Sequence, residues 1–220
     1  MSCPNCDPNM NRPYRLIITT ADGRYCKLCG DKITLSNYQG SQSLNNSKWD
    51  QYFHSICIAV ADKSPCLSRK IGAILVRDHS IVSTGFNGPS RGVPHCGHER
   101  MMKDTTFDDP MFDLVPASVR RPRFNSECPR KVLGYESGTH MELCPAQHAE
   151  VNAISNAARL GVSVLGTTLY MNSLHPCKNC FGALINAGIL EIVVDDISYY
   201  DKYTKFLSDN SSIIIRRFEL

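Results

Sequence analysis

The sequence has 220 residues, of which 42% are apolar, and a formal net charge of +3. This length is enough for one sizeable domain with a small additional module, and the small, mixed charge does not point to a polynucleotide partner. No apolar run reaches the roughly 18 residues of a transmembrane helix, and the first residues lack a signal-peptide pattern, so we expect a soluble, cytoplasmic protein with no membrane partner.

The first predicted unit covers residues 1–35 and contains two Cys-x-x-Cys pairs. Cys3 and Cys6 form one pair and Cys26 and Cys29 the other, with strand-like alternation between them. Because four thiolates close the coordination shell of a structural zinc ion, we predict a small zinc-ribbon-like module. The unit lacks a clear basic and aromatic patch for nucleic acid, so stabilisation or subunit contact is the favoured role.

The main domain is expected over residues 48–220, after a small, polar linker at residues 36–47. Hydrophobic periodicity there predicts a helix, two strands joined at Asp78-His79, and then helices and strands in alternation. The expected elements after the first helix are strands at 71–76 and 80–85, a helix at 148–160, a strand at 167–171, a helix at 177–187, a strand at 191–194, a helix at 201–207 and a strand at 213–218. The alternation predicts an α/β fold in which helices cover a sheet with parallel strands.

Residues 88–145 interrupt this pattern. They are rich in Pro, Gly, Arg and Met and show little periodicity, so we expect an irregular insertion. A structureless run of this length is unusual inside a compact domain. Cysteines within the insertion are therefore candidates for ordering it.

Two short segments carry the chemistry, and both stand at predicted helix starts. His148 precedes Glu150 by two residues, and Pro176 precedes a pair formed by Cys177 and Cys180. One His and two Cys leave a fourth position of a tetrahedral zinc ion open for water, which is typical of a catalytic site. Helix N-termini favour thiolates, and Glu150 is placed to move protons without binding the metal. The combination H-x-E and P-C-x-x-C is the signature of zinc deaminases. Taken singly, the His could be structural and the Cys pair a zinc knuckle or redox pair.

These motifs, with the segments at residues 68–73, 83–89, 144–154 and 176–180, resemble the deoxycytidylate (dCMP) deaminase family. The resemblance implies a three-layer α/β/α, cytidine-deaminase-like core with a mixed five-stranded sheet. It also implies substrate contact by Asn87, a homohexamer, and allosteric control by dCTP and dTTP, with Mg possible beside a nucleotide effector. Phe86 stands where the family usually has Tyr, which removes a hydroxyl from the loop linked to regulation.

Other site residues are proposed from their chemistry. A nucleotide phosphate needs cations, and Arg69, Lys70, Arg91 and Lys178 lie in or near the motifs; the alternative is that each is a solvated surface charge. Tyr199 or Tyr200 could pack on the base or form ordinary rim contacts. Members of the resembling family often carry a second, structural zinc, so a third zinc in this chain is a further candidate; its possible ligands are Cys66, Cys96, Cys128 and Cys144, with His95 or His98 as alternates. The alternative is that these cysteines are reduced, buried thiols.

The leading hypothesis is a hydrolase that deaminates dCMP to dUMP and ammonia and so supplies thymidylate synthesis. The nearest alternatives are a deaminase of dCTP, of both nucleotides, or of a base-modified dCMP. A tRNA adenosine deaminase shares the motif but prefers a basic face, which the modest charge does not indicate. A zinc-binding protein with a degenerate core is the non-enzyme alternative, and the intact Glu150 argues against it.

Overall fold

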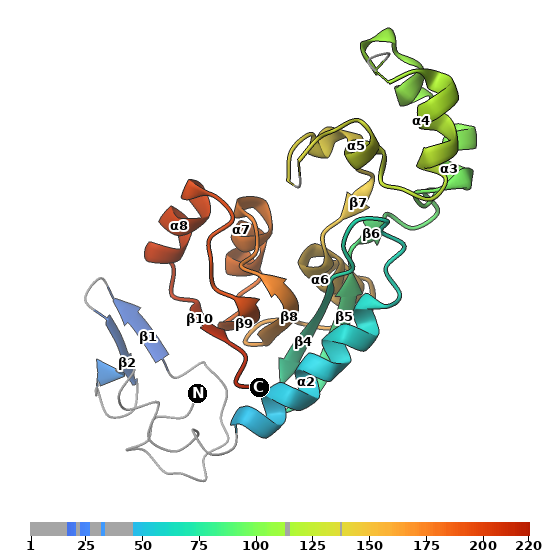
Figure 1. Cartoon of the computed structure of the whole chain (residues 1–220). Helices are drawn as coiled ribbons and strands as arrows, with labels where there is room; N and C mark the ends of the chain where they lie inside the picture. The colour runs from blue at the N-terminus through green and yellow to red at the C-terminus, as the bar shows by residue number, and fades with distance from the viewer. Residues whose placement is uncertain (1–16, 21–22, 27–31, 34–45, 113–114, 137) are drawn as a thin grey trace. The chain divides into compact units, whose positions relative to one another are not determined.

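The computed structural model describes residues 17–20, 23–26, 32–33, 46–112, 115–136 and 138–220 (Figure 1). Contacts divide the chain into two units, residues 1–52 with 218–220 and residues 53–217. The first unit contains an antiparallel sheet of β1 (Ile17–Thr20), β2 (Gly23–Cys26) and β3 (Lys32–Ile33). The predicted ligands Cys3, Cys6 and Cys29 lie outside the described residues, and Cys26 ends β2, so the N-terminal zinc site stays a prediction.

The second unit is built on a mixed five-stranded sheet in the order β10-β9-β8-β4-β5. Its strands are β4 (Gly72–Arg77), β5 (Ser80–Phe86), β8 (Thr168–Leu174), β9 (Glu191–Asp196) and β10 (Ile214–Arg217). Strand β4 pairs antiparallel with β5 and β8, whereas β8, β9 and β10 run parallel. Positive φ angles at Asp78 and His79 close the predicted turn between β4 and β5. The predicted mixed sheet is confirmed.

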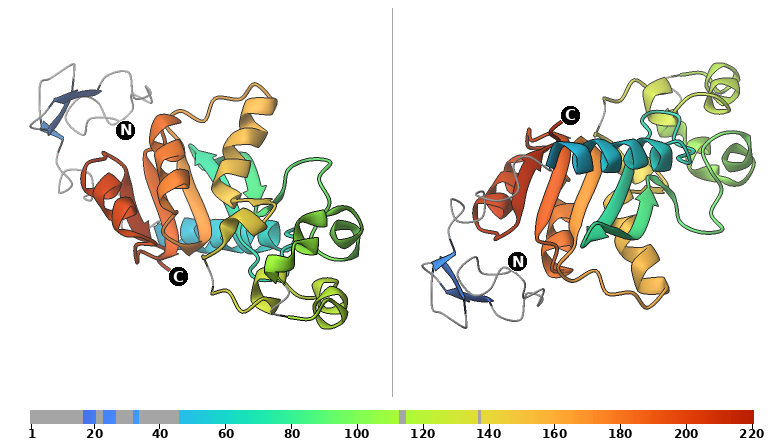
Figure 2. Two further views of the ribbon diagram at one scale, coloured as in Figure 1. Left: turned by 90° about the horizontal axis from the view of Figure 1, so that it is seen from above. Right: turned by 90° about the horizontal axis from the view of Figure 1, so that it is seen from below.

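Helices cover both faces of this sheet (Figure 2). The Phe53–Ala61 part of α2 (Asn46–Ala61) lies on one face, where the ring of Phe53 is 4.7 Å from that of Tyr170. The other face carries α6 (Ala149–Arg159), α7 (Lys178–Asn186) and α8 (Lys202–Asp209). The predicted three-layer α/β/α architecture is confirmed. No helix in the described ranges is both long and apolar enough to cross a membrane.

Gly85 lets α6 lie directly against β5. A Cβ atom at this position would stand 2.3 Å from the carbonyl oxygen of Ala149 and 2.3 Å from the amide nitrogen of Ala153. Both are backbone atoms that cannot swing away. The first turn of α6 contains Glu150 and directly follows His148, so this close contact also positions the motif.

We therefore expect Gly85→Ala to lower the free energy of unfolding by about 3 kcal/mol, the cost of overpacking a rigid contact, and to lower Tm by roughly 6–12 °C. Gly182 in α7 is the matched control, because a Cβ there meets no atom within 4 Å. Gly182→Ala should leave stability unchanged or raise it by up to about 1 kcal/mol. Thermal unfolding compares the two variants, and equal Tm values would refute the close packing.

The insertion at residues 88–145 differs from the irregular segment expected from the sequence. Short helices fill it, and it has a small aromatic and aliphatic core of its own, formed by Phe107, Phe112, Phe124, Val132 and Leu143. Its ends are joined by the antiparallel pairing of β6 (Gly88–Pro89) with β7 (Ala146–Gln147). The helices between them are α3 (His98–Lys103), η1 (Thr105–Asp108), η2 (Pro110–Phe112), α4 (Ala117–Phe124), α5 (Pro129–Val132) and η3 (Met141–Leu143).

Buried arginines order this insertion by binding carbonyl groups at the ends of its short helices. Arg120 is 2% exposed, and its guanidinium donates to the carbonyl oxygens of Phe107 at 3.0 Å and Phe112 at 2.6 Å. Arg100 donates to the carbonyl oxygen of Leu143 at 2.8 Å. Because helices of 3 or 4 residues leave most of their carbonyls unpaired, these side chains supply hydrogen bonds that the backbone cannot.

Candidate active site

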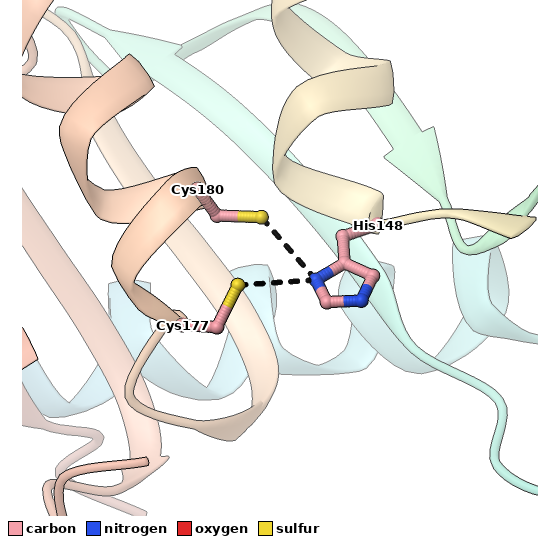
Figure 3. Close-up of side chains that lie close together, drawn as sticks. All are labelled: His148, Cys177 and Cys180. Atoms are coloured by element: carbon pink, nitrogen blue, oxygen red, sulfur yellow. Dashed lines mark hydrogen bonds between the residues drawn. The ribbon is translucent and has the colours of Figure 1, made fainter. Parts of the chain in front are cut away.

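Two helix N-termini bring three potential metal ligands together (Figure 3). His148 is the N-cap residue of α6, after β7, and Cys177 is the N-cap residue of α7, after β8. Cys180 lies in the first turn of α7. The Nδ1 atom of His148 is 3.5 Å from Sγ of Cys177 and 3.3 Å from Sγ of Cys180. Thus residues 29 and 32 positions apart in the sequence meet at one point.

The geometry of these donors fits a zinc ion. A tetrahedral zinc with Zn–N bonds of about 2.0 Å and Zn–S bonds of about 2.3 Å separates its ligand atoms by roughly 3.5–3.8 Å. The three potential ligand atoms of His148, Cys177 and Cys180 all lie within 4.8 Å of one another. Among the described residues, these three form the one group of at least three potential ligands that meets this criterion.

Electrostatics at the site favour a thiolate. Hydrogen bonds from Cys180 and His148 lower the pKa of the Cys177 thiol to about 4, against the opposing effect of burial. The same contact with Cys177 raises the pKa of His148. The pKa of the Cys180 thiol is raised by its hydrogen bond to Cys177 and by burial. The site therefore stabilises negative charge at the start of α7, where the helix dipole also favours it.

Glu150 lies beside this triad in the first turn of α6. Its side chain is 4% exposed, and burial raises the pKa of its carboxyl group. The thiol of Cys180 is within hydrogen-bonding reach of the carboxylate. Glu150 is thus a buried carboxyl group next to the potential ligands, a position from which it can exchange protons with a bound molecule.

His148 and Cys177 of the triad line one pocket together with Glu150, and the space in it that a water-sized molecule can reach is about 80 Å³. Three of the predicted substrate-binding residues, Asn87, Arg69 and Tyr200, also line it. Two others do not: Arg91 donates to Oδ1 of Asn156 at 2.9 Å, and the Lys178 ammonium lies 5.6 Å from the centre of the Tyr203 ring.

Asn87 is held at the pocket wall by its own hydrogen bonds. Its Oδ1 accepts from the amide of Ile71 at 2.8 Å and from the hydroxyl of Ser64 at 2.7 Å, and its Nδ2 donates to the carbonyl of Arg69 at 2.9 Å. An amide nitrogen has two hydrogens, so a second N–H remains for a ligand. The same bonds fix the turn that carries Arg69 into the pocket.

Two titratable residues that line the pocket, Arg130 and His175, were not among the residues predicted from the sequence. Arg130 lies in the insertion, whose fold the periodicity did not reveal. His175 stands two positions before Cys177 and is 1% exposed, with its ring 4.9 Å from Phe181 and 5.1 Å from Tyr199. Its Nδ1 lies 2.9 Å from the carbonyl oxygen of Pro176, and burial lowers its pKa, so the ring is neutral and donates through Nδ1. Its position two residues before Cys177 was the feature of the sequence that could have indicated a place in the pocket.

The four remaining candidate ligands, Cys66, Cys96, Cys128 and Cys144, do not form a group within 4.8 Å in the described part of the chain. Three of them are nevertheless neighbours. Burial is the main cause that raises the pKa of Cys96, and the charges of Cys144 and Cys128 act in the same direction. The third zinc site stays a prediction.

A doubly covered sheet with a His-Cys-Cys triad at two helix N-termini and a buried Glu defines a zinc-deaminase type of site. Comparison with known families agrees with this class: residues 47–195 match the model described as "Cytidine and deoxycytidylate deaminase zinc-binding region". The chain belongs to this family.

Curated relatives and solved structures of the family include several deoxycytidylate deaminases. The chain is 29% identical to that of Saccharomyces cerevisiae over 80% of its own length and 46% of the yeast protein. It is 32% identical to that of Enterobacteria phage T2 over 67% of its own length and 78% of the phage protein. The chain therefore spans about half the length of the yeast relative. The structure of the dCMP deaminase of cyanophage S-TIM5 in complex with dCMP and dUMP has the same fold, with a TM-score of 0.51 and 18% identity over 77% of this chain and 96% of that one.

Proposed function

We propose that this chain catalyses the hydrolytic deamination of dCMP, in which dCMP and water give dUMP and ammonia. The observation that carries the proposal is the convergence of His148, Cys177 and Cys180 beside the buried Glu150, at a pocket that His148, Cys177 and Glu150 line. Family membership and the names of the relatives support the substrate. The alternatives in the same pocket are dCTP, both nucleotides, or a base-modified dCMP.

In this proposal His148, Cys177 and Cys180 hold one zinc ion. When bound, zinc lowers the pKa of a coordinated water molecule toward neutrality and makes hydroxide available. Glu150 would accept one proton of the water and pass it to the ring nitrogen N3 as the oxygen bonds to C4 of the base. It would then take the proton of the C4 hydroxyl and give it to the amino group, which leaves as ammonia while the C4 carbonyl forms. Burial of Glu150 keeps bulk water from competing for these protons.

The pocket residues suggest how the nucleotide is oriented. The second N–H of Asn87 is available to a sugar oxygen, and the ring of Tyr200 supplies a surface for packing. Arg69 brings an exposed guanidinium to the pocket wall. Arg91 and Lys178 stay candidates for contact only through a movement of their side chains, because neither lines the pocket.

Two structural zinc ions complete the proposed metal content, one held by Cys3, Cys6, Cys26 and Cys29 and one near Cys66, Cys96, Cys128 and Cys144. We expect three zinc ions per chain in purified protein by elemental analysis. Two per chain would remove one structural site from the proposal, and one per chain would remove both.

Oligomer and effectors are also proposals. We expect a homohexamer and a response to dCTP and dTTP, with Mg accompanying the effector, as the family resemblance implies. Phe86, which replaces the usual Tyr, removes a hydroxyl from the loop before Asn87. We therefore expect dTTP to change the steady-state rate of dCMP deamination only weakly or not at all.

The proposed substrate is tested by incubating purified protein with dCMP, dCTP and cytidine and measuring ammonia release. We expect kcat/KM to be highest for dCMP. A higher value for dCTP would select the first alternative, and no turnover of any of the three would refute a deaminase of free cytosine nucleotides and nucleosides.

A further inference from the structure

The insertion does more than extend the fold, because it supplies part of the wall of the catalytic pocket. Arg130, Gly138, Met141 and Cys144 line the same pocket as His148 and Glu150. Tyr200, which follows β9, touches this wall: a Cβ on Gly138 would stand 2.2 Å from its hydroxyl oxygen. A residue of the insertion can therefore contact a molecule bound at the triad.

Arg130 is the cationic side chain in this wall, and only part of its guanidinium is hydrogen-bonded. Its Nη1 donates to the carbonyl oxygen of Thr139 at 2.5 Å and to the sulfur of Met141 at 2.8 Å. Its Nε is buried without a hydrogen-bond partner among the described residues. The bonds to Nη1 hold the guanidinium in place and leave Nη2 to donate to an anion in the pocket.

Arg130 forms no ion pair within 4.0 Å in the described part of the chain, although its charge, after a backbone hydrogen bond and the contact with His140, contributes to the lowered pKa of Glu142. The residues that line the pocket include two guanidinium groups, Arg130 and Arg69, and a single carboxyl group, the buried Glu150. Ser68 adds a hydroxyl donor next to Arg69. The two arginines come from separate segments, one from the core and one from the insertion, and both bring positive charge to one small volume. This is the arrangement that a phosphate dianion requires.

We propose that Arg130 binds the 5′-phosphate of the nucleotide together with Arg69, and that the insertion thereby makes the enzyme selective for a nucleotide over a nucleoside. This inference rests on the proposed function, since it assigns a specificity-determining residue to the same pocket. It also explains why Arg91 and Lys178 are not required at the pocket wall: the second cation comes from the insertion.

The test compares kcat/KM for dCMP and for deoxycytidine in the wild type, in Arg130→Ala and in Arg130→Lys. We expect Arg130→Ala to raise KM for dCMP by about 10- to 100-fold, the effect of losing one charge-assisted contact, and to leave deoxycytidine turnover within about twofold. Arg130→Lys should recover only part of the loss, because an ammonium keeps the charge without the planar fork. Arg121→Ala is the matched control, because Arg121 is an exposed arginine of the insertion that pairs with Asp108.

A purely structural role for Arg130, as a clamp on Thr139 and Met141, predicts a different result. Both substrates would then lose kcat/KM to the same extent in Arg130→Ala, and that outcome overturns the inference. Calorimetry provides a readout that does not depend on turnover. Wild-type protein should bind dUMP more tightly than deoxyuridine, and Arg130→Ala should lose this difference.

The two proposals fail in different ways. Wild-type protein that binds dUMP more tightly than deoxyuridine but deaminates neither dCMP nor deoxycytidine refutes the proposed function and leaves the phosphate contact supported. Wild-type protein that deaminates dCMP but shows the same preference for dCMP after Arg130→Ala refutes the phosphate contact alone. Equal binding of dUMP and deoxyuridine by the wild type refutes it whether or not dCMP is a substrate.

Discussion

Glu150→Gln is expected to reduce kcat for dCMP by about 10²- to 10⁴-fold while zinc content and Tm stay close to those of the wild type. Glutamine keeps nearly the shape of the buried side chain, so the packing at the start of α6 is preserved. It cannot accept the proton of water or return it to the base and the departing amine. Because one carboxyl group serves all these transfers in the proposed mechanism, the loss should be near the upper end of the range.

Steady-state kinetics together with zinc analysis check this expectation. Glu99→Gln is the control, because Glu99 is an exposed carboxylate that pairs with Lys103 on α3, away from the pocket. That variant should retain wild-type activity. Full activity of Glu150→Gln would show that another group moves the protons and would refute the mechanism.

Removal of a metal ligand should be at least as damaging. In Cys180→Ala, two of the three proposed protein ligands remain, and we expect zinc content to fall by about one ion per chain and activity to fall to background. Loss of metal rather than loss of fold is the predicted cause, since the core around Phe181 and Leu184 keeps its apolar contacts.

Cys57→Ala gives the matched comparison for this loss. Cys57 is also buried, on α2, and burial raises the pKa of its thiol, as expected for an inert cysteine in the core. Its replacement should leave zinc content and kcat unchanged with a modest decrease in Tm. Unchanged zinc content in Cys180→Ala, measured by elemental analysis, would contradict the assignment of the triad.

The sequence was informative wherever local pattern and chemistry coincide. Periodicity predicted the strands and helices of the core in the correct order, because each core element is long enough to show an apolar face. The motifs around His148 and Cys177 were interpretable because short spacing places side chains at a helix start. The structure brings these two segments together by pairing β8 with β4, a long-range contact that the sequence indicates only through the alternation of elements.

The insertion shows where such reasoning stops. Its helices, such as α3 and α5, are 6 and 4 residues long, too short for a periodic signal, and α4 contains Pro122. Charge is also a poor guide in the insertion. A charged residue such as Arg120 is normally expected at the surface, but here its side chain is buried and bonds to backbone carbonyl groups. Arg130 could not be assigned to the pocket from the sequence, because the residues around it do not indicate which distant segment it faces.

Proximity in sequence was also an imperfect guide to proximity in space. Lys178 directly follows the N-cap residue Cys177, yet its ammonium lies over the ring of Tyr203 instead of lining the pocket. Successive residues of a helix point about 100° apart, so the neighbour of a ligand need not face the same site. Arg69, by contrast, lines the pocket, and a hydrogen bond from Nδ2 of Asn87 to its carbonyl oxygen fixes the turn that carries it.

The proposed reaction is hydrolysis of the amino group of dCMP by water activated beside His148, Cys177, Cys180 and Glu150. The most direct measurement is mass spectrometry of the product after incubation of zinc-loaded protein with dCMP in ¹⁸O-labelled water. We expect dUMP that carries one ¹⁸O atom on the base, with one ammonia released per dUMP, and loss of both products in Glu150→Gln. Unchanged dCMP, or dUMP without the label, would contradict the proposed reaction.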